Sequence, residues 1–132
     1  MNIFFEIHKD LTREGPGDSQ STRQAISLLK DLPVHPLILD IGCGPGMQTL
    51  DLAAYTSGEI IAVDTHQPFL DQLQRRIEIK GLAERVHLAN VSMFDLKFPE
   101  QNFDVIWSEG AIYIIGFENG LRTWRRLLKH GG

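Results

Sequence analysis

Cysteine is almost absent from this 132-residue sequence, since Cys43 is the only one. A single cysteine excludes an internal disulfide and any zinc site built from cysteine pairs. Basic residues are in the minority as well: 13 Lys and Arg stand against 17 Asp and Glu, which leaves a net charge of -4. We therefore expect no nucleic-acid partner and no binding to an anionic membrane.

Long apolar runs are also lacking. No stretch approaches the roughly 20 apolar residues that cross a bilayer, and the first ten residues lack the basic and apolar segments of a secretory signal. The apolar share of 42% is that of an ordinary globular chain. The sequence thus predicts one globular domain in the cytoplasm.

Two helices are expected before the first strand. An apolar face predicts the first helix over residues 1–11, and the glycines and proline at residues 15–17 end it. The second helix is expected to begin near Ser19 or Ser21 and to end at Pro33. Its expected apolar stripe consists of Ala25, Ile26, Leu28, Leu29 and Leu32.

From residue 37 onward, short apolar runs alternate with helical patterns. The expected strands are 37–41, 59–63, 86–89 and 103–107, and the expected helices are 48–55, 67–80 and a last one that begins at Phe117. This alternation is typical of right-handed βαβ units, in which helices cover both faces of a parallel sheet. The fold class is therefore α/β with a mainly parallel sheet.

The stretch from Leu39 to Gly46 reads Leu-Asp-Ile-Gly-Cys-Gly-Pro-Gly and joins the first expected strand to its helix. Gly42 and Gly44 allow a tight turn and a close approach of the backbone to a ligand. A plain strand-to-helix turn does not need three glycines in five residues, because each glycine costs backbone entropy. We therefore expect this loop to bind a nucleoside or nucleotide.

The spacing of the glycines indicates which ligand fits. A dinucleotide fingerprint has its third glycine one residue later than Gly46, and the carboxylate of Asp40 would repel a pyrophosphate. No Lys-Ser or Lys-Thr pair follows the glycines, which excludes a P-loop. Asp40 suits instead a ligand that carries an ammonium and a sulfonium group.

This loop resembles motif I of the class I S-adenosylmethionine-dependent methyltransferases, a D-x-G-x-G-x-G pattern. The helix that opens Met47-Gln48-Thr49-Leu50 is similar to theirs as well. The resemblance implies a Rossmann-like three-layer α-β-α sandwich with the strand order 3-2-1-4. It also implies that residues 37–132 bind S-adenosylmethionine as cofactor and that residues 1–36 form a helical segment over the cofactor site.

The same resemblance implies further cofactor contacts. Asp64 ends the second strand, where a carboxylate can accept hydrogen bonds from both ribose hydroxyls, although an acid at this place also fits an NAD site. Thr65 would lie near the ribose or adenine, or cap the next helix. Ser92 stands where many members carry an acid that binds the adenine amino group, and Met93 would pack on the ring. The full expected set is Asp40, Gly42, Cys43, Gly44, Gly46, Asp64, Thr65, Ser92, Met93, Ser108 and Glu109.

The candidates for a catalytic role are Glu109, His8 and Tyr113. Glu109 follows the fourth strand at its carboxyl end, where ligands bind in open parallel sheets, so it would face the sulfonium or the incoming nucleophile. The alternative is a glutamate that faces solvent or caps a helix. Methyl transfer needs a general base, such as His8, only if the acceptor must lose a proton.

The predicted function is methyl transfer from S-adenosylmethionine to an unidentified, small-molecule acceptor. Two alternatives stay open: a catalytically inactive nucleoside-binding module and an NAD-dependent oxidoreductase. The family's sheet has seven strands and only four are placed here, so we expect a domain truncated at its C-terminus. The fourth strand would then offer an edge for a homodimer, unless the last helix, with Trp124 and Leu128, covers it.

Overall fold

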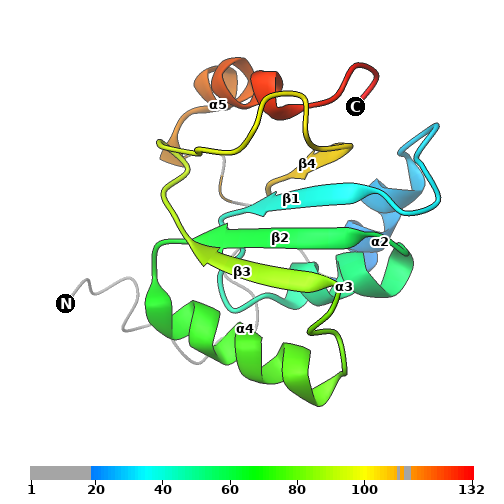
Figure 1. Cartoon of the computed structure of the whole chain (residues 1–132), viewed down its shortest axis with the longest axis vertical. Coiled ribbons are helices and arrows are strands. Elements are labelled where there is room, and N and C mark those ends of the chain that lie inside the picture. Colours follow the sequence, from blue (N-terminus) through cyan, green and yellow to red (C-terminus); the bar gives the residue numbers. More distant parts are fainter. Residues whose placement is uncertain (1–18, 110, 112–113) are drawn as a thin grey trace.

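A computed structural model describes residues 19–109, 111 and 114–132 of the chain. Four parallel strands form one sheet in the order β3-β2-β1-β4, the order that the family resemblance implies (Figure 1). The strands are β1 (Leu37–Ile41), β2 (Glu59–Asp64), β3 (Val86–Asn90) and β4 (Val105–Trp107). The fold is thus the expected Rossmann-like α/β arrangement.

The interior position of β1 follows from its composition. Ile38, Leu39 and Ile41 are fully buried, so the strand is apolar on both faces, as strands of parallel sheets are. The register places Asp40 beside Ala62 of β2 on one side and beside Trp107 of β4 on the other. This register brings the carboxyl ends of the neighbouring strands to one edge of the sheet.

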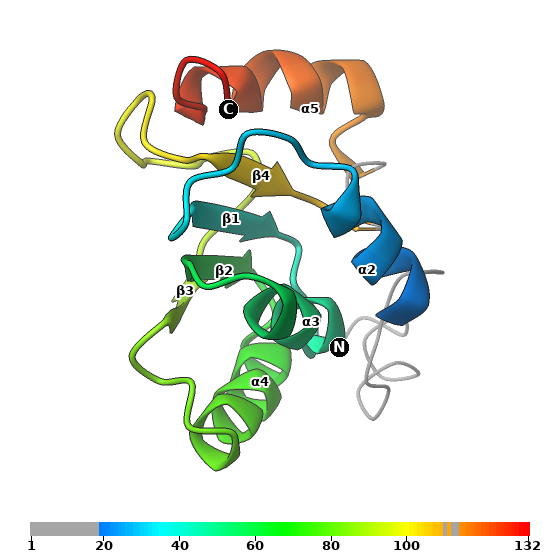
Figure 2. The same cartoon turned by 90° about the vertical axis from the view of Figure 1, so that its right-hand side faces the viewer.

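Three helices pack on the first face of the sheet. They are α2 (Ser19–Ser27), α3 (Met47–Tyr55) and α4 (Gln67–Ile79). The buried residues of α4 are Phe69, Leu70, Leu73 and Ile77, the face that its sequence pattern predicts. In Figure 2, α2 and α3 lie side by side and α4 lies at the β3 end of the molecule.

In the described part of the chain, one helix and an irregular segment cover the second face. The helix α5 (Phe117–Trp124) continues into a 3-10 turn, η2 (Arg125–Leu127). Trp124 and Leu127 pack there with Leu39 and Ile41 of β1, together with Leu96 from the segment after β3. α5 lies at the β4 end of the molecule, opposite α4 (Figure 1).

The predicted extent of α2 is wrong at its C-terminal end. The helix stops at Ser27, and Leu28 beyond it is 76% exposed, so Leu28 does not belong to a buried stripe. The Ser27 hydroxyl donates to the Gln24 carbonyl at 2.6 Å, a local bond that competes with helix continuation. Thr22 is the buried residue of this helix instead.

The strand β4 starts at Val105 and not at Phe103 as predicted, because Phe103 pairs with the segment around Leu128. The Phe103 N–H donates to the Leu127 carbonyl at 2.9 Å, and the Phe103 carbonyl accepts from Lys129 N–H at 2.8 Å. The segment after the last helix therefore covers the beginning of the β4 edge. Among the strands in the described part of the chain, Val105–Trp107 pairs with β1 alone.

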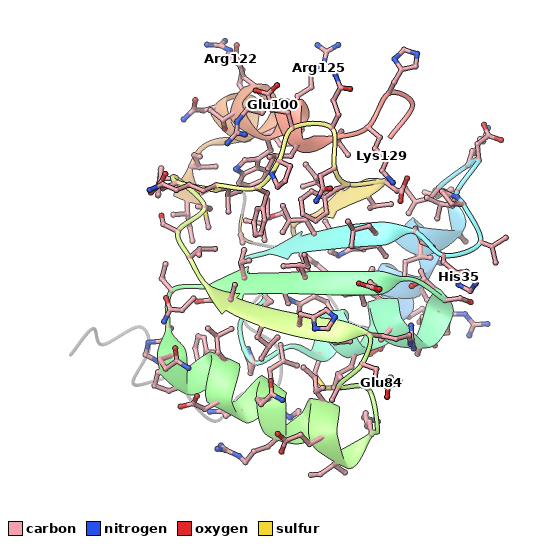
Figure 3. The ribbon with its side chains drawn as sticks, in the orientation of Figure 1. His35, Glu84, Glu100, Arg122, Arg125 and Lys129 are labelled. Carbon is pink, nitrogen blue, oxygen red and sulfur yellow. The ribbon has the colours of Figure 1, made fainter. Side chains whose placement is uncertain are left out.

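Several charged side chains point away from the core of this fold (Figure 3). Figure 3 shows Arg122 and Arg125 pointing outward from the last helical segment and Glu84 outward from the loop after α4. No helix in residues 19–109, 111 and 114–132 combines the length and the apolar composition that a membrane crossing requires.

Candidate cofactor site

The glycine loop after β1 is fixed by hydrogen bonds to its neighbours. The N–H groups of Gly42 and Cys43 both donate to the carbonyl oxygen of Val63, at 2.9 and 3.0 Å. The Gln48 side chain of α3 donates to the Cys43 carbonyl at 2.6 Å. The loop is thereby held to the end of β2 and to the start of α3.

Three glycines of this loop, Gly42, Gly44 and Gly46, have positive φ angles of 71°, 56° and 95°. Residues with a side chain rarely adopt this conformation, so the loop requires glycine for its backbone path. At Gly46 there is a second requirement, because a Cβ atom would overlap the side chain of Leu73 in α4. The third glycine therefore allows α4 to pack closely against the loop.

Asp64 at the end of β2 binds the glycine loop directly. One carboxylate oxygen accepts from Gly44 N–H and the other from His66 N–H, both at 2.9 Å. Each carboxylate oxygen has two lone pairs, so each can accept one further hydrogen bond. Asp64 can thus bind both hydroxyls of a ribose without releasing the loop.

Asp40 lies beneath the loop and is fully buried. Its carboxylate accepts a hydrogen bond from the Thr49 hydroxyl of α3 at 2.6 Å. Burial, followed by the negative charges of Asp40 and Asp64, raises the pKa of the Cys43 thiol well above its usual value. The thiol therefore stays protonated at neutral pH, and the loop has a negative potential that favours a cationic ligand.

The segment after β3 reaches the same loop. The methyl group of Met93 lies 3.8 Å from the position of a Cβ atom at Gly42, and the Met93 carbonyl accepts from the Trp124 indole N–H at 3.2 Å. The Ser92 hydroxyl accepts from Phe94 N–H at 3.1 Å and shapes the turn. Ser92 still has its own proton to donate to a ligand.

The segment after β4 brings Ser108 and Glu109 to this edge. The hydroxyl oxygen of Ser108 is buried and has no hydrogen-bond partner in the described part of the chain. Glu109 accepts from the Thr22 hydroxyl, whose oxygen lies 2.8 and 2.7 Å from the two carboxylate oxygens, and from the Trp107 indole N–H at 3.2 Å. Glu109 thereby connects α2 to the carboxyl end of β4.

One expected site residue, Thr65, differs in setting from the rest, and two lie outside the described residues. Thr65 follows β2 and its side chain is exposed. His8 and Tyr113 lie outside the described residues. Within 19–109, 111 and 114–132, no group of three or more His, Cys, Asp or Glu residues could hold a metal ion.

Sequence reasoning missed the residues that hold the expected ones in place. Thr49 binds Asp40, and Thr22 binds Glu109 across 87 positions of sequence. Arg76 of α4 donates to the Pro45 carbonyl of the glycine loop at 2.6 Å. Thr49 could have been found from the sequence, because it carries a hydroxyl in the first turn of the helix that follows the loop. No local pattern indicates the role of Thr22.

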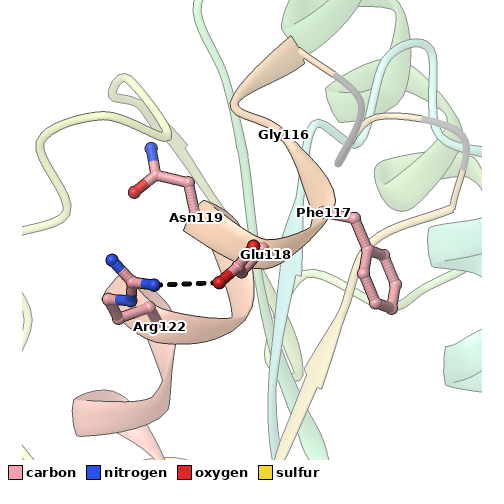
Figure 4. A pocket seen from close by; sticks show the side chains of 5 residues that line it. All are labelled: Gly116, Phe117, Glu118, Asn119 and Arg122. Atoms are coloured by element: carbon pink, nitrogen blue, oxygen red, sulfur yellow. Dashed lines mark hydrogen bonds and ion pairs between the residues drawn. The ribbon is translucent and has the colours of Figure 1, made fainter.

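A separate pocket lies at the start of α5 (Figure 4). Its lining consists of Gly116, Phe117, Glu118, Asn119 and Arg122. Glu118 and Arg122 form an exposed ion pair at 3.0 Å, and the Phe117 ring points to the other side of the helix. None of the residues expected at the cofactor lines this pocket.

Comparison with known proteins is consistent with this geometry. The family model of a methyltransferase domain matches residues 38–132. The chain is 26% identical over 119 residues to protein arginine N-methyltransferase 1 of Saccharomyces cerevisiae, covering 90% of this chain and 34% of that protein. It is 24% identical over 96 residues to a sterol 24-C-methyltransferase of Aspergillus fumigatus, covering 72% of this chain and 26% of that protein.

A solved structure shares the fold over the whole chain. It is that of a methyltransferase from Thiobacillus denitrificans in complex with S-adenosylhomocysteine, with a TM-score of 0.87 and 23% identity, covering 100% of this chain and 53% of that one. The chain thus spans about half of that protein and about a quarter to a third of the two curated relatives.

The contact between Gly46 and Leu73 leads to a stability prediction. Gly46→Ala introduces both a strained positive φ and an overlap with Leu73, and we expect the free energy of unfolding to fall by about 2–4 kcal/mol. Gly81→Ala is the matched control, since Gly81 also has a positive φ, of 68°, but a Cβ atom there meets nothing within 4 Å. Chemical denaturation measures both variants. Equal losses in the two would refute the overlap with Leu73.

Proposed function

This chain belongs to the class I S-adenosylmethionine-dependent methyltransferases, and we propose that it binds S-adenosylmethionine and transfers its methyl group to a small-molecule acceptor. The observation that carries the proposal is the placement of two carboxylates at the glycine loop, because Asp64 accepts from Gly44 N–H and the buried Asp40 accepts from the Thr49 hydroxyl. A cationic nucleoside suits their negative charge, whereas the pyrophosphate of NAD does not.

The residues of the loop fit such a cofactor. Asp64 has lone pairs left for two ribose hydroxyls, and Met93 beside Gly42 offers an apolar surface for the adenine. The hydroxyl of Ser92 can donate to the adenine ring. Ser108, whose buried hydroxyl otherwise lacks a partner among the described residues, can bind the amino-acid end of the ligand.

When bound, S-adenosylmethionine supplies a methyl group that its sulfonium already activates. The chain then has to hold the nucleophile of the acceptor in line with that methyl group, and orientation alone can contribute about 7–11 kcal/mol to the rate. The glycine loop would fix the position of the cofactor in this alignment, because the hydrogen bonds of the loop to Val63 and Asp64 leave it little freedom. Residues 1–36 would cover the cofactor, a role to which the buried Thr22 contributes through Glu109.

The relatives of this chain are named for different acceptors. The two curated relatives are named for a protein arginine and a sterol, so the family accommodates acceptors of different size. A small molecule is our proposal because the chain carries no net basic charge for nucleic acid. Among the candidates for a catalytic role, Glu109 is the one within the described residues.

Ligand binding tests the proposal. In isothermal titration calorimetry, we expect the 132-residue chain to bind S-adenosylmethionine and S-adenosylhomocysteine, and to bind both more tightly than NAD. The physical reason is the negative potential at the glycine loop. Equal or tighter binding of NAD would contradict the proposal.

Replacement of the Asp64 carboxylate by an amide tests its role. Asp64→Asn should weaken the binding of S-adenosylhomocysteine by about 1.5–3 kcal/mol, the usual contribution of hydrogen bonds to a charged group. Asp71→Asn is the control, because Asp71 is an exposed acid of α4 and the change in charge is the same. If both variants bind as the unmodified chain does, Asp64 is not part of the site.

We further propose that two chains associate through the edge of β4. Val105–Trp107 has backbone groups on its outer side that no strand of the described part pairs with, and such an edge favours pairing with another chain. Light scattering of the 132-residue chain over a concentration series should therefore show a dimer. A monomer throughout the series would mean that the edge is protected.

A further inference from the structure

Glu109 is held in one orientation by side chains from two different elements. The Thr22 hydroxyl of α2 lies within 2.8 Å of both carboxylate oxygens, and the Trp107 indole of β4 donates to one of them. Thr22 itself is almost completely buried, at 1% exposure. A glutamate that merely faced solvent would not be fixed by a buried hydroxyl, since it would already be hydrated.

The sheet register relates the segment that carries Glu109 to the strand that leads into the glycine loop. Asp40 of β1 pairs with Trp107 of β4, and Glu109 follows Trp107 by two residues, as Gly42 follows Asp40. Ala111, two residues further on, lies directly against Gly42. Glu109 thus lies in the sequence between Trp107, whose partner in β1 is Asp40, and Ala111, which contacts Gly42 of the loop.

The order of the strands determines which end of a bound nucleoside lies toward β4 and Glu109. Asp64, the expected ribose ligand, ends β2, and the adenine side lies toward β3, so the opposite end of the ligand lies toward β1 and β4. That end carries the sulfonium and the amino acid of S-adenosylmethionine. Asp40 in β1 and Glu109, two residues after β4, are acids on these two strands.

We propose that Glu109 recognises the positive charge of the sulfonium and that Thr22 is the positioning residue that orients it. This inference rests on the proposed function and goes beyond it, because it assigns a charge preference to one side chain. Methyl transfer converts the cationic sulfonium into a neutral thioether as the methyl group leaves with the acceptor. A fixed carboxylate therefore favours the cofactor over the spent product and helps the product to leave.

Two analogues that differ in this one charge provide the test. S-adenosylhomocysteine has a neutral thioether, whereas sinefungin carries an amine, protonated at neutral pH, on the carbon that replaces the methylated sulfur. Both share the nucleoside and the amino-acid end, so the ratio of their affinities isolates the charge. Calorimetry of the 132-residue chain should show tighter binding of sinefungin.

Variants of the two residues should change this ratio rather than overall binding. Glu109→Gln should lower the preference for sinefungin about tenfold, as the loss of one partly screened charge interaction implies. Thr22→Val removes only the hydroxyl and should lower the preference about threefold, while Thr22→Ser should retain it. Glu84→Gln and Thr56→Val are the matched controls, because both residues lie in loops at the amino ends of β3 and β2, whereas Glu109 follows the carboxyl end of β4.

The outcomes separate this inference from the proposed function. If the unmodified chain binds neither analogue, the proposed function fails. If the chain binds both and the affinity ratio is the same in Glu109→Gln and Thr22→Val, the function stands and the inference is overturned. Equal weakening of both analogues also overturns it, because Glu109 would then serve only to anchor α2. Should Thr22→Val fail to fold, as monitored by circular dichroism, Glu109→Gln decides alone.

Discussion

The site depends on one shared acceptor, the carbonyl oxygen of Val63, to which the N–H groups of Gly42 and Cys43 both donate. These bonds tie the loop after β1 to the last residues of β2. Asp64, the residue after Val63, then lies within reach of Gly44, and Gly46 can start α3 from a left-handed conformation. The backbone has to turn tightly to bring both N–H groups to the Val63 carbonyl oxygen, and this turn requires glycine.

The charges of the site are arranged differently from those of the surface. On the surface, acids pair with bases, as Glu118 does with Arg122 and Asp95 with Lys97. At the site, backbone N–H groups hold Asp64, and the nearby Arg76 binds a carbonyl oxygen instead of a carboxylate. Neutral donors orient a carboxylate without cancelling its charge, so the charge remains available to a ligand.

The sequence predicted those parts of the fold and site that depend on local pattern. The buried face of α4 repeats at helical spacing, and Asp40 and Asp64 stand in or at the end of short apolar runs, so the elements and the loop could be inferred, while the strand order followed from the family resemblance. It could not predict contacts between distant segments. The Thr22 hydroxyl meets Glu109 across 87 residues, and Phe103 leaves β4 because it pairs with a segment 25 positions later, which local periodicity does not encode.

The parallel register also orders the events of folding. β1 and β2 are joined by one helix, as are β2 and β3, whereas Leu37 and Asp104, which bind each other at the start of β1 and β4, are 67 residues apart. Closing the longer loop costs more chain entropy, so contacts of this kind form late and slow the overall rate. We therefore expect the glycine loop and Asp64 to come together in an early intermediate of three strands. The wall of the site that carries Trp107 and Glu109 would be added in the last step.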